Sequence, residues 1–167
     1  MKSNGSAYVA VVFAVLVGYF TYQWWFNPSR AVKRRLGEVA AALSVPSQEV
    51  EVGRIARVAQ LRKYLAPDIR VRVGDPAQEM TPRDTVLALV AGFRPAAGDF
   101  HVRFTDTQVF VDAEAAAHAY MTVEVVTPDR QSGQPTIDSR SASVDLAKVD
   151  REWVVTIAEL KPIPTRP

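Results

Sequence analysis

Cysteine is absent from the 167-residue chain. Disulfide bridges, thiolate zinc sites and cysteine nucleophiles are therefore excluded together. Histidine is scarce, and because the two histidines form no HxH or HExxH arrangement, we expect no metal site. The eight glycines are scattered and no serine stands in a GxSxG turn, which excludes a phosphate-binding loop and an esterase-type nucleophile. The sequence thus indicates no catalytic residue and no cofactor.

Charge is also missing from the N-terminal part, where Lys2 is the only charged side chain before residue 30. The formal net charge of +2 divides into +1 from Lys2, −3 from residue 36 onward, and +4 from a cluster between them, formed by Arg30, Lys33, Arg34 and Arg35. A slightly acidic domain behind a short basic cluster has no broad basic face. This distribution argues against nucleic acid as a partner.

One long uncharged run, residues 7–26, matches the roughly 30 Å of bilayer hydrocarbon. Tyr22, Trp24 and Trp25 gather at its C-terminal end, where aromatic rings favour the headgroup level. The run exceeds the apolar core of a signal peptide, and no small-x-small cleavage site follows it. We therefore predict a short tail at 1–6 and an uncleaved, single-pass membrane helix at 7–26, with the aromatic residues and the basic cluster at the membrane interface.

Three helices are expected next, because apolar residues recur at helical spacing in three stretches that end at prolines. The first begins at Asn27-Pro28-Ser29, a capping residue followed by an early proline. The second is expected at about 49–65, with Ile55 on its buried apolar face and Arg57 on its exposed face. The third opens with Thr81 as the N-cap.

From residue 100 onward the apolar period changes to two, which predicts strands in "DFHVRF", "TQVFVD", "AHAYMTVEVV", "SRSASVDLAKV" and "EWVVTIAEL". Because no helix intervenes, we expect an antiparallel meander, with the polar run 129–138 as a flexible connection. Helices first and strands afterwards indicate one α+β domain at 27–161, with helices packed on one face of the sheet. Residues 162–167 are expected to form a flexible tail.

The order of these elements resembles the nuclear transport factor 2-like superfamily, also called SnoaL-like. "LRKYLAPDIRVRV" is similar to the family's second helix entering its first strand, "TPRDTVLALVAGF" to the helix before the long hairpin, and "VDREWVVTIAEL" to the closing strand. The resemblance implies a cone in which three N-terminal helices pack on a curved antiparallel sheet, here preceded by the transmembrane helix. The family includes isomerases, dehydratases, cyclases and binding or assembly domains, so fold alone constrains function poorly.

Enzymes of this family place an acid–base pair inside the cone, where an apolar pocket tunes the pKa values. Residue by residue, this chain offers only Tyr64, at the end of the second helix, and Asp68, at the start of the first strand, as residues that could line the mouth of a cavity. The alternative for Tyr64 is a core residue with its hydroxyl at the rim.

A second candidate set lies on one strand: His118, Tyr120, Thr122 and Glu124 alternate with apolar residues. Strand parity places them on the outer face of the sheet, away from any cone interior. There they form either a solvated face or a surface for self-association or partner docking; related cones commonly pair in this way.

The sequence therefore favours a membrane-anchored, non-enzymatic assembly or ligand-binding module of the bacterial envelope. Its expected partners are the lipid bilayer and a second copy of the chain or other envelope proteins; the small-molecule ligand is unknown. The alternatives are a cavity enzyme using Tyr64 and Asp68, or a lipid carrier with an open apolar tunnel. Family precedent places the domain outside the inner membrane, in the periplasm, whereas the count of positive charges favours the cytoplasm.

Overall fold

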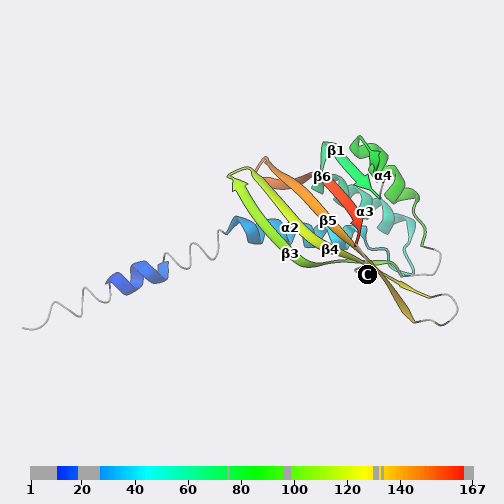
Figure 1. Cartoon of the computed structure of the whole chain (residues 1–167), viewed down its shortest axis with the longest axis horizontal. Coiled ribbons are helices and arrows are strands. Elements are labelled where there is room, and N and C mark those ends of the chain that lie inside the picture. Colours follow the sequence, from blue (N-terminus) through cyan, green and yellow to red (C-terminus); the bar gives the residue numbers. More distant parts are fainter. Residues whose placement is uncertain are drawn as a thin grey trace, which may run out of the picture.

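The computed structural model describes residues 11–18, 27–74, 76–95, 99–129, 132 and 134–163. Of the predicted span 7–26, only 11–18 is described; this segment is helical, lies apart from the folded domain (Figure 1), and exposes large apolar side chains such as Phe13. No helix within the described residues is long and apolar enough to cross a membrane. Tyr22, Trp24 and Trp25 lie outside the described residues, so their interfacial role stays a prediction.

Three helices and six strands make up the described part of the domain. They are α2 (Pro28–Leu43), α3 (Glu51–Tyr64), β1 (Leu65–Val73), β2 (Gln78–Met80), α4 (Arg83–Gly92), β3 (His101–Ala113), β4 (Ala116–Pro128), β5 (Pro135–Val149) and β6 (Glu152–Pro162). The predicted start of α2 is confirmed: Pro28 is its first residue, and the Asn27 side chain accepts a hydrogen bond from the Ser29 backbone N–H at 3.0 Å. The predicted cap of α4 is wrong, because Pro82 occupies the N-cap position and no side chain caps the helix.

All six strands form one sheet in the order β2-β1-β6-β5-β4-β3. The prediction of a wholly antiparallel sheet is wrong at one pairing, because β1 runs parallel to β6, with Val71 opposite Ala158. The sheet is therefore mixed. Local alternation specifies which residues form strands, but this pairing joins the first strand of the domain to the last, and no local pattern encodes it.

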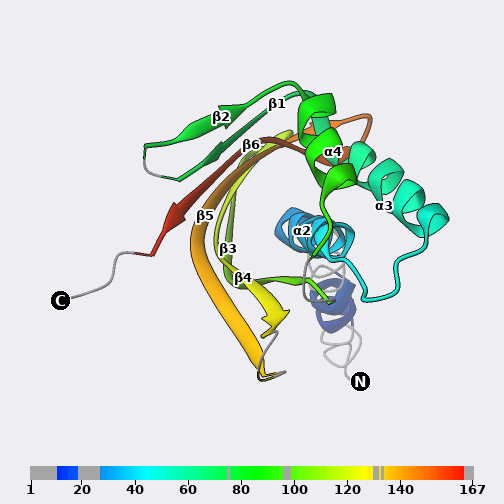
Figure 2. The same cartoon turned by 90° about the vertical axis from the view of Figure 1, so that its right-hand side faces the viewer.

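The sheet curves around α2, which lies in its concavity while α3 and α4 flank it (Figure 2). The stripe Val32, Leu36 and Val39 of α2 is buried, as its helical spacing predicts. It belongs to the same core as inward-facing residues of β4 and β5, among them Ala119 and Val144. The fold is thus α+β with helices on one face of a curved sheet, as expected.

The predicted orientation of α3 is wrong at two positions. Arg57 is buried, with 8% of its surface exposed, whereas Ile55 is 61% exposed. The cause is Glu49, which precedes the helix: its carboxylate accepts hydrogen bonds from Arg57 Nε at 2.6 Å and Nη2 at 3.1 Å. Arg57 Nη1 also donates to the Ala42 carbonyl at 3.3 Å. A partner outside the helix therefore overrides the helix's own apolar period.

The connection between β4 and β5 is shorter than the predicted run 129–138. β5 begins at Pro135, and Thr136 pairs with Thr127 of β4, so the two strands extend as a ribbon that projects from the domain (Figure 1). The ladder hydrogen bonds join backbone groups, so polar residues can take part in this pairing. At the other end, β6 reaches Pro162, one residue into the predicted tail.

Candidate functional site

An apolar cavity of about 150 Å³ lies between α2 and the concave face of the sheet. All sixteen residues that line it are aliphatic or aromatic hydrocarbons or methionine: Leu36, Val39, Leu43, Leu61, Leu65, Ile69, Val71, Val86, Phe104, Met121, Val123, Ala142, Val144, Val155, Ala158 and Leu160. Within the described part of the chain, no ionisable side chain lines this cavity. It can accept an apolar group, but it offers no donor, acceptor or proton.

Tyr64 and Asp68 do not meet at one cavity mouth. The Tyr64 ring is buried, its hydroxyl accepts a hydrogen bond from Gln60 Nε2 at 2.8 Å, and the Arg35 guanidinium carbon lies 4.8 Å from the ring centroid. Tyr64 lines a depression on the surface together with Arg35, Gln60 and Glu152. Asp68 is exposed on β1 and lines neither this depression nor the apolar cavity.

The outward parity of β4 is confirmed. Ala117, Ala119, Met121 and Val123 are buried, whereas the alternate residues His118, Thr122 and Glu124 are half-buried and Tyr120 is 54% exposed. These four side chains therefore project from the convex face of the sheet. Whether they act as an interaction surface stays a prediction.

The sequence missed Phe110, which joins this face from β3. Register places Phe110 opposite His118, and their rings stack with centroids 5.0 Å apart. Tyr120 packs edge-on against both, with centroids 5.5 Å from His118 and 6.3 Å from Phe110. We call Phe110, His118 and Tyr120 the convex-face cluster. The signal lay in the alternation of "TQVFVD", but only the register shows that the three rings meet.

Acidic and basic side chains lie on the two strands that carry the convex-face cluster. Asp112 Oδ2 lies 2.8 Å from His118 Nδ1, and Arg103 Nη2 lies 3.5 Å from Glu124 Oε2. The face therefore combines an exposed aromatic centre with polar groups around it, the composition common in protein interfaces.

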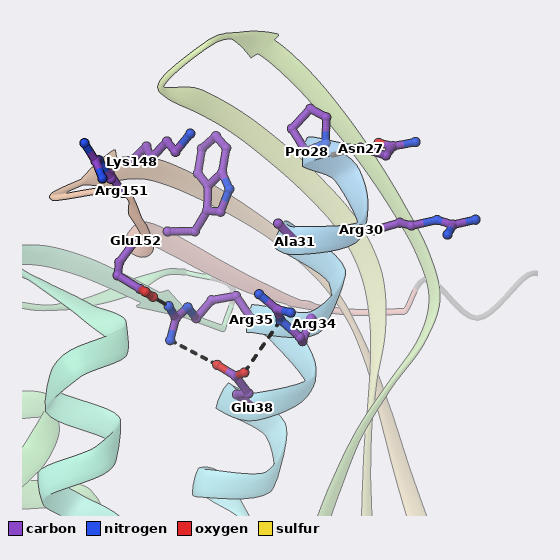
Figure 3. Close-up of a pocket in the computed structure, with 11 residues that line it drawn as sticks. Asn27, Pro28, Arg30, Ala31, Arg34, Arg35, Glu38, Lys148, Arg151 and Glu152 are labelled. Atoms are coloured by element: carbon purple, nitrogen blue, oxygen red, sulfur yellow. Dashed lines mark hydrogen bonds and ion pairs between the residues drawn. The ribbon is translucent and has the colours of Figure 1, made fainter. Parts of the chain in front are cut away.

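A larger pocket, of about 510 Å³, lies where the start of α2 meets the turn between β5 and β6. Arg30, Arg34 and Arg35 line it from α2, and Lys148, Arg151 and the buried Trp153 line it from the hairpin (Figure 3). We call it the basic pocket. Lys33, the remaining cation of the predicted cluster, is exposed on α2 and does not line it. Sequence reasoning missed Lys148 and Arg151, because only the fold brings the hairpin to α2.

The described residues contain no group of three or more His, Cys, Asp or Glu side chains able to hold an ion. Two of the acids, Asp112 and Glu124, instead contact His118 and Arg103, as described above.

The geometry defines an NTF2-like, cystatin-like fold. An NTF2-like protein with a cystatin-like fold from Novosphingobium aromaticivorans is similar at a TM-score of 0.68 and 12% identity, over 88% of this chain and 90% of that one. A protein of unknown function from Mycobacterium tuberculosis is similar at a TM-score of 0.67 and 11% identity, over 87% of this chain and 76% of that one. ActVI-ORFA from Streptomyces coelicolor is similar at a TM-score of 0.63 and 14% identity, over 80% of this chain and 96% of that one. No protein-family model matches the sequence, and no curated protein does. At these identities the likeness extends to the fold alone.

Proposed function

We propose that the domain is a non-enzymatic ligand-binding and assembly module of the bacterial envelope, held at the membrane by residues 7–26. The observation that carries the proposal is the wholly apolar lining of the cavity inside the cone. General acid–base catalysis needs a titratable group within hydrogen-bonding reach of the substrate. A cavity lined only by hydrocarbon and thioether groups is instead suited to hold an apolar group.

The size of the cavity indicates the size of the ligand. An apolar cavity of about 150 Å³ in another protein stays dry and binds benzene, and the cavity between α2 and the sheet has the same volume. The ligand we propose is therefore a benzene-sized apolar group, either a small hydrocarbon or the end of an acyl chain.

The competing proposal, a cavity enzyme of the isomerase, dehydratase or cyclase kind, needs an ionisable group in this same cavity. Its two candidates point elsewhere: the Tyr64 hydroxyl is bonded to Gln60, and Asp68 is exposed on β1. Binding without turnover is therefore the preferred function.

Filling the cavity is expected to abolish binding of an apolar probe. Ala142 is buried and lines the cavity, so Ala142→Leu occupies the space that benzene would take. In methyl NMR spectra of the full-length chain in mild detergent, benzene should shift the Leu36 and Val144 signals saturably. The Ala142→Leu variant should lose this response and gain about 0.5–1 kcal/mol of stability, as filled cavities commonly do.

Ala41→Leu is the matched control, because it makes the same change on the exposed side of α2. It should leave the benzene response intact, which separates cavity binding from partition into detergent. An unchanged response in Ala142→Leu, or none in the native chain, would contradict the proposal.

The convex-face cluster supplies the assembly part of the proposal. Tyr120 and Phe110 are 54% and 47% exposed, and large aromatic side chains in such positions are typical anchors of protein interfaces. The neighbouring Asp112, Arg103 and Glu124 include both charge signs, so the face can complement itself about a two-fold axis. We propose a second copy of the chain as the occupant.

The domain is proposed to lie on the periplasmic side of the inner membrane. Since the chain has no cysteine, a single cysteine at Ser132, exposed between β4 and β5, reports the side. We expect the Ser132→Cys chain in intact cells to react with a membrane-impermeant maleimide. Protection until lysis, in a variant that labels fully afterwards, would place the domain in the cytoplasm.

A further inference from the structure

The basic pocket carries an excess of positive charge. Five cationic side chains and two acidic ones, Glu38 and Glu152, line it. Both acids engage Arg35: Glu38 Oε2 lies 3.0 Å from Arg35 Nη1, and Glu152 pairs with the other guanidinium nitrogen (Figure 3). Arg34 Nε is 4.0 Å from Glu38, and Lys148 and Arg151 form no ion pair with any described residue. The five cations exceed the two acids by three, and neither acid pairs with Lys148 or Arg151.

The charges of α2 oppose the dipole of the helix. Its first turn contains no acidic residue and its last turn no basic one, the reverse of the arrangement that stabilises a helix. Arg30 and Arg34 are also one turn apart on the same side, where like charges repel. Such a cluster lowers the stability of the helix, and an anion bound between the cationic groups would relieve the repulsion.

The hairpin turn presents Arg151 in an uncommon backbone conformation. Asp150 and Arg151 have φ angles of 50° and 68°, in the left-handed region where tight hairpins usually carry Asn-Gly or Asp-Gly, so Arg151 stands where glycine is usual. Residues other than glycine held in this region store strain and cluster at binding sites. In this turn the strain accompanies a guanidinium at the rim of the pocket.

We propose that the basic pocket binds a phosphate group, carried by a lipid headgroup or by a small soluble molecule. Arginine offers a planar fork that matches phosphate oxygens, and lysine adds a compact charge. Lys148 Nζ lies 6.0 Å from the centroid of the buried Trp153 ring, which gives the pocket an apolar wall that excludes water from one side. The proposal needs neither the apolar cavity nor the convex-face cluster, so it can fail or stand independently of them.

Arg151→Gly and Asp150→Gly form a matched pair, because glycine accepts the backbone of this turn at both positions and only the first change removes a lining cation. Binding of a short-chain phosphatidic acid, with phosphatidylcholine as the neutral lipid, is measured by calorimetry on the full-length chain in non-ionic detergent. Inorganic phosphate is titrated in parallel.

We expect saturable binding of phosphatidic acid, none of phosphatidylcholine, at least fivefold weaker binding in Arg151→Gly, and unchanged or tighter binding in Asp150→Gly. Lys148→Met, which keeps an apolar contact with Trp153, should weaken binding in the same direction. If inorganic phosphate also binds and responds to Arg151→Gly, a soluble phosphate suffices; if only the lipid binds, the headgroup is the source. Equal affinities in the two glycine variants, or no saturation with either probe, would overturn the proposal.

Discussion

Replacing Glu49 by alanine is expected to lower the free energy of unfolding by about 3 kcal/mol, because the change leaves the guanidinium of Arg57 buried without its partner. The two side chains are only 9% and 11% exposed, and the carboxylate receives two hydrogen bonds from the guanidinium. After the substitution, Arg57 retains only its bond to the Ala42 carbonyl. Urea unfolding of the full-length chain, followed by circular dichroism, measures the loss.

Two further variants separate burial from mere loss of an ion pair. Glu51→Ala removes a carboxylate that pairs with Arg54 at 3.5 Å and is 77% exposed, so it should cost less than about 1 kcal/mol. The double variant Glu49→Leu with Arg57→Met replaces the buried pair by apolar groups and should recover most of the stability. A loss in Glu49→Ala no larger than that in Glu51→Ala would show that the Arg57 charge is not effectively buried.

The same pair sets a dependence on pH. The hydrogen bond from Arg57 holds the pKa of Glu49 below the ordinary carboxyl value of 4.5; burial opposes this shift, and the positive charges of Arg57, Arg54 and Arg94 add to it. A folded-state pKa below the unfolded one means that the stabilisation is complete above pH 4.5 and is lost as the pH falls through the folded pKa. The stability gap between the native chain and Glu49→Ala should therefore narrow in acid.

The sequence was sufficient to predict the features that depend only on residues within one helix or strand. Asn27 and Pro28 specify the start of α2 through capping and a fixed φ angle, and alternation along β4 specifies which side of the sheet each residue faces. These features depend on neighbours in the chain, so a local pattern encodes them.

The sequence was not sufficient to predict the features that depend on contacts between segments far apart in the chain. The burial of Arg57 depends on Glu49, the parallel pairing of β1 depends on β6, and the basic pocket depends on a hairpin turn that meets α2. The apolar cavity is a further case, because a pattern of inward-facing apolar side chains predicts a hydrophobic core whether or not a cavity remains in it. Whether their volumes fill the interior or leave about 150 Å³ is decided by packing across α2, the sheet and α4.

Tyr120→Arg is expected to dissociate the proposed dimer, weakening self-association about 100-fold or more. In a two-fold symmetric interface the change occurs twice, and near the axis it places two new cations close to one another. The variant also removes the ring that packs edge-on against Phe110 and His118. Tyr120 itself is 54% exposed and no described contact in the core depends on it, so the fold should survive.

Sedimentation of the detergent-solubilised full-length chain measures the effect, with Ala41→Arg as the control. Ala41 is exposed on α2, and α2 lies on the concave side of the sheet (Figure 2), so a cation there adds the same charge without entering the interface. The native chain and Ala41→Arg should sediment as dimers, and Tyr120→Arg as a monomer. Identical sedimentation of all three would mean that the convex-face cluster does not join two copies, and the exposed rings would then have to be assigned to a different partner.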